Sequence, residues 1–114
     1  MRSFIRLMKA CSDPNRVKII KLLQHKTMCV CELQGALGLA QPTVSKHLKI
    51  LEEAGVVESI KDGLWVNYYL ADGSGSPYVA NLIGNLKHWL NDDPEVVELT
   101  NKIPFLDRET LCRK

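Results

Sequence analysis

Residues 29–59, CVCELQGALGLAQPTVSKHLKILEEAGVVES, decide the fold. Apolar residues recur there at helical spacing up to Gly38, a residue type that commonly ends helices. A second apolar stripe begins after Pro42, which suits the first turn of a helix, and stops before Gly55. The stripe residues are Val30, Leu33 and Leu37 in the first segment and Val44, Leu48 and Leu51 in the second. Two short helices joined by a turn that contains glycine are typical of a helix-turn-helix motif, whose second helix is the recognition element.

Two β-rich runs, residues 56–60 and 64–70, follow this motif directly. They are rich in Val, Ile, Trp and Tyr, and Lys61, Asp62 and Gly63 separate them. The Asp-Gly pair favours a hairpin turn. Because a hairpin directly after a recognition helix is a wing, the sequence predicts a mainly α fold with a small β-hairpin, a winged helix-turn-helix.

The rest of the chain contributes further helices. Residues 4–12 and 14–24 have helical periodicity, and Asp13 can cap the second of these segments. A broad apolar stripe predicts a helix over residues 78–90, wider than one small core requires, so that part of it can pack against a second copy. We therefore assign residues 1–92 to one DNA-binding and dimerisation domain and residues 93–114 to a tail, with or without a short helix.

The length of 114 residues suits one compact domain. No apolar run approaches the ~18 residues of a membrane span, and the first nine residues lack the apolar stretch of a secretion signal. We expect a cytoplasmic protein with no membrane partner. In a reducing cytoplasm, its four cysteines are expected to be thiols or metal ligands rather than disulfides.

Charge is distributed unevenly along the chain. Residues 1–50 carry nine Lys or Arg side chains against Asp13 and Glu32, whereas residues 51–114 carry six against eleven Asp or Glu. A basic half suggests a polyanionic partner, although a solvated basic surface gives the same composition. An enzyme is not expected, because no nucleophile with a base, no acid–base pair and no phosphate-binding glycine loop stands at a recognisable spacing.

The outward face of the second motif helix is polar and basic, as a helix in a DNA groove requires. Its candidate DNA-binding residues are Gln41, Thr43, Ser45, Lys46 and Lys49, and Lys61 joins them from the hairpin. The uncharged side chains can hydrogen-bond to base edges or phosphates, and the lysines supply the phosphate contacts that dominate affinity. His47 lies nearer the buried flank, which favours a structural or hydrogen-bonding role.

Three segments together resemble the ArsR/SmtB family of metal-responsive repressors. They are residues 7–23 (LMKACSDPNRVKIIKLL), residues 29–59 and residues 61–70 (KDGLWVNYYL). The resemblance implies a homodimer, built mainly from the first helix and the helix after the wing, that represses transcription from a palindromic operator in double-stranded DNA. Two-fold symmetry would pair two recognition helices with two half-sites.

Cys29 and Cys31 stand at the start of the third helix, in a stretch that resembles the thiolate site of the family's arsenic and antimony sensors. Residues i and i+2 lie about 200° apart on an ideal helix, but in an extended or frayed first turn they can converge on one ion. Soft thiolates select soft ions, so As(III) or Sb(III) is the leading inducer, and DNA binding requires no cofactor.

The third ligand of this site is open. The family's three-cysteine version has a third Cys where this chain has Gln34. Cys112 is the candidate we include, since neighbouring basic residues favour its thiolate. Cys11 is the other candidate, although core packing explains it better. Two thiolates alone are the remaining possibility.

Other regulators of the same class also stay open. The family's zinc sensors use a carboxylate and histidines on the dimer helix, where this chain offers His88 alone, so no zinc site is predicted. A cadmium or lead sensor and a thiol-redox repressor in which Cys29 or Cys31 oxidises are the alternatives. A winged-helix module that binds protein rather than DNA is a third class, and the salt dependence of DNA binding distinguishes it.

Overall fold

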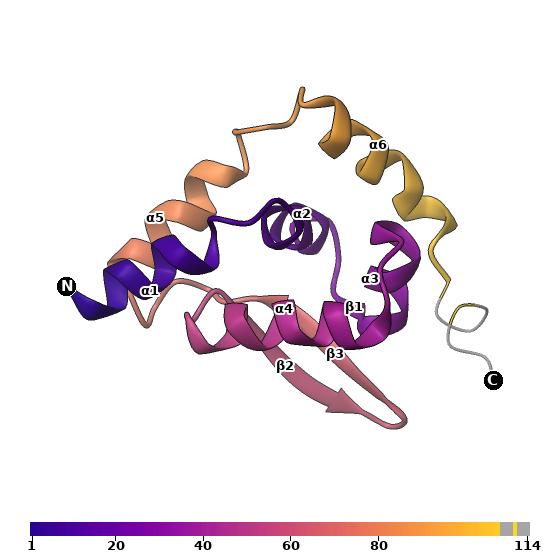
Figure 1. Cartoon of the computed structure of the whole chain (residues 1–114), viewed down its shortest axis with the longest axis horizontal. Coiled ribbons are helices and arrows are strands. Elements are labelled where there is room, and N and C mark those ends of the chain that lie inside the picture. Colours follow the sequence, from indigo (N-terminus) through magenta and orange to yellow (C-terminus); the bar gives the residue numbers. More distant parts are fainter. Residues whose placement is uncertain (108–110, 112–114) are drawn as a thin grey trace.

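The computed structural model describes residues 1–107 and Leu111, and it has the predicted winged helix-turn-helix architecture (Figure 1). The elements are α1 (Arg2–Ala10), α2 (Pro14–Leu23), β1 (Met28–Cys29), α3 (Val30–Leu37), α4 (Gln41–Glu53), β2 (Val57–Asp62), β3 (Trp65–Leu70), α5 (Pro77–Leu86), α6 (Pro94–Lys102) and the 3-10 turn η1 (Ile103–Phe105). No helix in this described part is long and apolar enough to cross a membrane.

The helix-turn-helix pair is α3 and α4, as the sequence predicts. Gly38 ends α3 in the left-handed region, with φ of 69°, where glycine carries no Cβ penalty. The inward stripe of α4 is completely buried, since Val44, Leu48 and Leu51 are each 0% exposed. Both helices therefore pack on one core, which leaves the opposite face of α4 in solvent.

Short polar residues followed by proline set the start of three helices. Asp13 accepts a hydrogen bond from the Arg16 backbone N–H at 3.1 Å at the start of α2. Ser76 and Asp93 cap α5 and α6 in the same way. Because each cap satisfies backbone donors that the first turn leaves without a helical partner, these boundaries are encoded locally.

The wing is an antiparallel hairpin whose turn is displaced from the predicted one. β2 continues through Lys61 and Asp62, which pair with Val66 and Trp65 of β3. The loop therefore consists of Gly63, with φ of 61°, and Leu64, rather than residues 61–63. A glycine at the first position of a two-residue loop gives the turn the twist that matches its strands, so the two strands pair to their ends.

A third strand, β1, is a feature that sequence periodicity missed. It pairs antiparallel with β3, Met28 opposite Tyr68 and Cys29 opposite Asn67, so that the sheet order is β1-β3-β2. Two residues are too few to show a strand pattern. This pairing joins the start of α3 directly to the wing.

The helix after the wing is shorter than expected: α5 ends at Leu86 and not at Leu90. Lys21 of α2 is only 2% exposed, and its ammonium donates hydrogen bonds to the carbonyls of Leu86 at 2.6 Å and Trp89 at 2.8 Å. Burial lowers the pKa of Lys21. Leu90 then takes a positive φ of 65°, which no continuing α-helix allows.

The short helix considered for the tail is present as α6, which arches over α2 and α3 (Figure 1). Val96 and Leu99 are buried, each 6% exposed, and Leu99 belongs to the same hydrophobic core as α2 and α4. Lys102 Nζ donates a hydrogen bond to the Ala36 carbonyl of α3 at 3.1 Å. Residues 94–102 thus brace the helix that starts at the cysteines.

Candidate DNA-binding surface and thiol site

The outer face of α4 presents the predicted polar residues together. Gln41, Thr43, Lys46 and Lys49 are exposed, and Ser45 is half-buried. Within residues 1–107 and Leu111, neither Lys46 nor Lys49 enters an ion pair. Their positive charges are uncompensated and available to an anionic partner.

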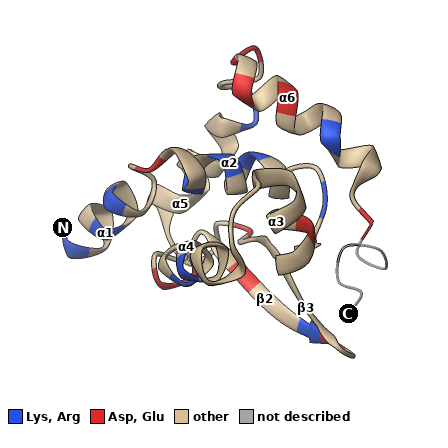
Figure 2. Cartoon of the chain, turned by 45° about the vertical axis from the view of Figure 1, so that its right-hand side comes forward, with Lys and Arg blue, Asp and Glu red and all other residues tan. Residues whose placement is uncertain are grey.

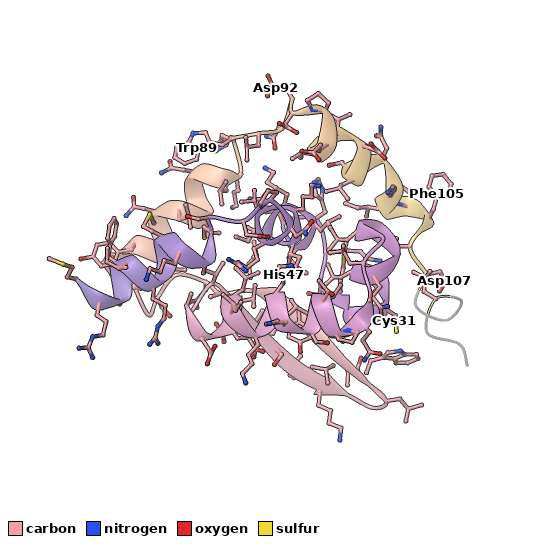
Figure 3. The ribbon with its side chains drawn as sticks, in the orientation of Figure 1. Cys31, His47, Trp89, Asp92, Phe105 and Asp107 are labelled. Atoms are coloured by element: carbon pink, nitrogen blue, oxygen red, sulfur yellow. The ribbon has the colours of Figure 1, made fainter. Side chains whose placement is uncertain are left out.

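His47, on the inner flank of α4, is anchored by a residue that the sequence did not single out. Arg16 Nη1 lies 3.3 Å from His47 Nδ1, and Arg16 Nε donates to the Ala10 carbonyl at 2.6 Å. Because a guanidinium only donates, Nδ1 must be the acceptor in this contact. Figure 3 shows His47 directed from α4 toward the interior. Arg16 thereby fixes α4 to the end of α1, in line with the hydrogen-bonding role expected for His47.

The wing extends from the carboxyl end of α4. Ser59 Oγ of β2 donates to Glu52 Oε2 of α4 at 3.1 Å, which ties the two elements together. Lys61 is exposed on β2, one residue pair before the turn. Figure 2 shows Lys and Arg along α1 and α2, and basic and acidic residues together on the wing and on α6. The wing therefore adds one cation to the side of the molecule that carries α4.

α1 and α5 lie side by side and share an exposed apolar face. The rings of Phe4 and Tyr78 meet edge to face, with centroids 5.4 Å apart and an interplanar angle of 71°. Phe4 is 38% exposed, Tyr78 45% and Met8 36%, and Trp89 beyond the end of α5 is 52% exposed. Such a contiguous apolar surface is typical of a site that binds a partner.

Cys29 is the N-cap of α3 and a residue of β1. Its side chain and the Glu32 backbone form one half of a capping box, and the Cys29 backbone N–H donates to Glu32 Oε1 at 3.1 Å as the other half. Glu32 also pairs with Lys26 Nζ at 2.8 Å. Cys29 is 2% exposed, and burial is the main cause that raises the pKa of its thiol.

Cys31, in the first turn of α3 (Figure 3), is half-buried. It is disulfide-bonded, contrary to the expected thiol. Cys112, the third predicted ligand, lies outside the described residues. Leu111, its neighbour in the sequence, packs on α3, since a Cβ at Gly35 would stand 3.0 Å from the Leu111 side chain. The described C-terminal segment thus returns to the helix that carries Cys31.

Cys11 is a free cysteine that packs partly buried against the core, and burial raises the pKa of its thiol. This environment fits the packing role that we favoured for it. Among residues 1–107 and Leu111, no three His, Cys, Asp or Glu side chains form a group that could hold a metal ion. The described residues therefore supply Cys29 and Cys31 at one place and no third ligand beside them.

The sequence of this chain is similar to those of known transcription regulators. Residues 13–59 match the family described as bacterial regulatory protein, arsR family. An uncharacterized HTH-type transcriptional regulator of Methanocaldococcus jannaschii is 46% identical over 67 residues, 58% of this chain and 75% of that protein. The arsenical resistance operon repressor of Escherichia coli K12 is 41% identical over 68 residues, 59% of this chain and 58% of that repressor.

A solved structure extends the similarity over more of the chain. The homodimeric winged helix-turn-helix DNA-binding domain from Mycobacterium bovis aligns with a TM-score of 0.65 and 26% identity, over 76% of this chain and 77% of that domain. The names of these proteins describe transcription regulators, and none describes an enzyme.

Proposed function

Because the chain belongs to the ArsR family of bacterial regulatory proteins, we propose that it is a homodimeric repressor that leaves its operator when a thiophilic ion binds Cys29 and Cys31. The observation that carries this proposal is the position of Cys29. It is at once the cap of α3 and the strand residue paired with Asn67 of the wing. A ligand on its sulfur would therefore act on both DNA-binding elements.

DNA docks on the exposed face of α4 in this proposal. The recognition helix enters the major groove, where Gln41, Thr43 and Ser45 contact base edges or phosphates. Lys46 and Lys49 contact phosphates beside the groove, and Lys61 contacts the backbone beyond it. The absence of ion pairs at Lys46 and Lys49 in the described chain supports this, because no internal contact must be broken before DNA binds.

Dimerisation uses the apolar face of α1 and α5. Phe4, Met8, Tyr78 and Trp89 would be covered by the same face of a second copy, as an interface with two-fold symmetry requires. The homodimeric winged-helix domain to which this chain is similar supports the choice of a second copy. A dimer then sets two copies of α4 on the two halves of a palindromic operator.

The ion proposed is As(III) or Sb(III), and arsenite enters as arsenious acid. In each step a thiol sulfur bonds to arsenic, an As–O bond breaks, and the thiol proton leaves with the hydroxyl as water. Cys31 must first be reduced to take part: a dithiol reductant attacks its disulfide, releases the Cys31 thiol and is itself oxidised to a disulfide. Two such steps occupy Cys29 and Cys31, and Cys112 is the proposed donor for a third.

Binding of the ion is coupled to DNA through the start of α3. Turning the Cys29 sulfur toward an ion shared with Cys31 withdraws it from the Glu32 backbone and removes half of the capping box. The same movement displaces β1 from its pairing with β3. Couplings of this kind are typically about 1–3 kcal/mol, or about 5- to 150-fold in affinity, which is enough to empty an operator.

A thiol-redox repressor is the second candidate, and the disulfide at Cys31 favours it. In this version a disulfide oxidant converts the Cys31 thiol and a second thiol into a disulfide and is itself reduced to two thiols, which releases the DNA. A thiol reductant reverses the exchange and restores binding. No ion takes part. The residues that contact DNA are the same in both candidates.

One experiment separates the candidates. The reduced protein is titrated without oxygen on DNA of its own promoter with arsenite, antimonite, cadmium or zinc, and in a parallel series with a disulfide oxidant. Release by arsenite or antimonite, reversed by a competing dithiol, is expected. Release by the oxidant alone would establish the redox candidate, release by cadmium alone would make it a cadmium sensor, and failure to bind the promoter at all would overturn both.

A further inference from the structure

We infer that a basic groove between α1 and α4 binds the DNA backbone at the centre of the operator, in addition to the contacts of α4 and the wing. The inference rests on the proposed function, since it requires α4 to lie on DNA. The groove has a volume of about 860 Å³. Its lining includes four cationic residues, Arg2, Arg6, Lys9 and Arg16, together with Ile5 and Ile50.

The charge of the groove is of one sign. No Asp or Glu is among its lining residues, and none of its four cations enters an ion pair within residues 1–107 and Leu111. Arg16 is committed to backbone carbonyls and His47, but Arg2, Arg6 and Lys9 are exposed. Three uncompensated cations beside one another form a surface that attracts a polyanion.

The arrangement of α1 separates this basic edge from the proposed dimer face. At 3.6 residues per turn, Arg2, Arg6 and Lys9 fall within about 60° of one another around the helix. Phe4 and Met8 lie roughly on the opposite side. The same helix can therefore pack against a second copy with one face and hold DNA with the other.

Ile50 places the groove beside the DNA-reading face. It follows Thr43 and Lys46 at i+7 and i+4 on α4, so that the three share one stripe of that helix. A DNA strand that runs along the Thr43–Lys46 stripe therefore passes the mouth of the groove. Arg2 to Lys9 spans about 10 Å along α1, roughly the rise of three base pairs.

The position of α1 selects the centre of the operator. Figure 1 shows α1 at the opposite end of the molecule from the wing tip, with α4 between them. Because α1 also carries the dimer face, its side of α4 is the one nearest the two-fold axis. The wing then contacts the outer flank of each half-site and the α1 groove contacts the inner flank.

The test compares the Arg2→Ala/Arg6→Ala double variant with Lys87→Ala, which removes an exposed cation at the end of α5. Operator affinity is measured against salt for each. The double variant should lower the slope of log K against log salt by about two for each protomer, while Lys87→Ala leaves it unchanged. Arg2→Lys/Arg6→Lys should restore the slope, because the charge returns.

Operators with uncharged methylphosphonate linkages at the central positions locate the contact. Such linkages should weaken binding of the unaltered protein and leave the double variant unaffected, which a mere loss of dimerisation would not produce. If the double variant keeps the original slope while Lys46→Ala lowers it, the inferred groove contact is overturned and the repressor proposal stands. If the affinity of the unaltered protein for the operator does not fall as the salt concentration rises, the repressor proposal itself is overturned.

Discussion

Lys21 Nζ lies 2.6 Å from the Leu86 carbonyl oxygen, so that a buried lysine of α2 caps the end of α5. The same ammonium donates to the Trp89 carbonyl and, at 2.7 Å, to Asn91 Oδ1. Three acceptors surround one buried cation, which is the arrangement that a charge in a protein interior requires. This contact decides where α5 stops and how the chain turns into α6.

We expect Lys21→Met to lower the free energy of unfolding by about 3 kcal/mol. The methionine fills the space but leaves the carbonyls of Leu86 and Trp89 without their charged donor, and such losses cost about 1–3 kcal/mol each. Lys18→Met is the control on the same helix. Among the residues that the structure describes, Lys18 pairs with exposed Glu95, so its replacement should cost less than about 1 kcal/mol. Denaturant unfolding measures both, and equal losses would contradict the capping role.

Replacing Lys46 by alanine should weaken binding to all DNA sequences alike. A phosphate contact carries no sequence information, so the salt slope should fall by about one for each protomer while the ratio of operator to non-operator affinity stays unchanged. Electrophoretic or fluorescence titration at several salt concentrations measures this. An unchanged slope would remove Lys46 from the backbone contacts.

Replacing Thr43 by valine should instead change which half-site is preferred. Thr43 is exposed on the proposed groove face, and loss of one base-edge hydrogen bond costs about 1–3 kcal/mol on the correct base alone. Binding to the operator and to half-sites mutated one base pair at a time provides the measurement. Gln41→Ala is tested in parallel, and an equal fall on every sequence would mean that neither residue reads bases.

The sequence predicted the parts of the fold that local chemistry determines. The buried stripe of α4, the glycine end of α3 and the Asp13 cap all follow from residues within a few positions of one another. Contacts between residues distant in the sequence could not be predicted in this way, and Lys21 is an example. Nothing near it in the sequence indicates that its acceptors lie 65 to 70 residues away, so the end of α5 was placed too late.

The candidate site also combines features that local sequence predicts with features that depend on contacts between distant segments. The exposed lysines of α4 follow from helical periodicity, whereas the pairing of Cys29 with Asn67 and the contact of Arg16 with His47 join distant segments. The sequence predicts that Cys29 and Cys31 can converge on one ion where the third helix has an extended start. Cys29 does have extended backbone angles. The strand that holds it extended was missed because it is only two residues long.

Replacing Cys29 or Cys31 by serine should abolish the response to arsenite and leave operator binding intact. Serine is a poor ligand for a soft ion, but it is a preferred N-cap, so that Cys29→Ser can still begin α3. The double variant should behave like either single variant, because one thiol cannot chelate. Operator release under reducing conditions is the measurement, and thermal unfolding confirms that each variant folds.

Two further serine variants assign the third ligand. Loss of the response in Cys112→Ser or in Cys11→Ser would name the donor, and retention in both would mean that two thiols suffice. If Cys29→Ser and Cys31→Ser repressors still leave DNA when arsenite is added, the arsenite proposal is wrong and DNA binding alone stands.

The pH dependence of induction should identify the ion. Burial raises the pKa of the Cys29 thiol above its ordinary value of 9.0, so that this group is protonated at neutral pH. Arsenious acid takes up a thiol and releases water, which leaves the proton balance unchanged. Arsenite affinity should therefore vary little between about pH 6.5 and 8. A cadmium ion must displace the proton of the Cys29 thiol, so this thiol alone should make cadmium affinity rise by about tenfold for each pH unit in the same range. Competition titrations with a fluorescent operator, in buffers of constant ionic strength, measure both. Arsenite affinity that climbs as steeply as that of cadmium would show that the ligand binds displaced thiolates rather than the protonated thiol described here.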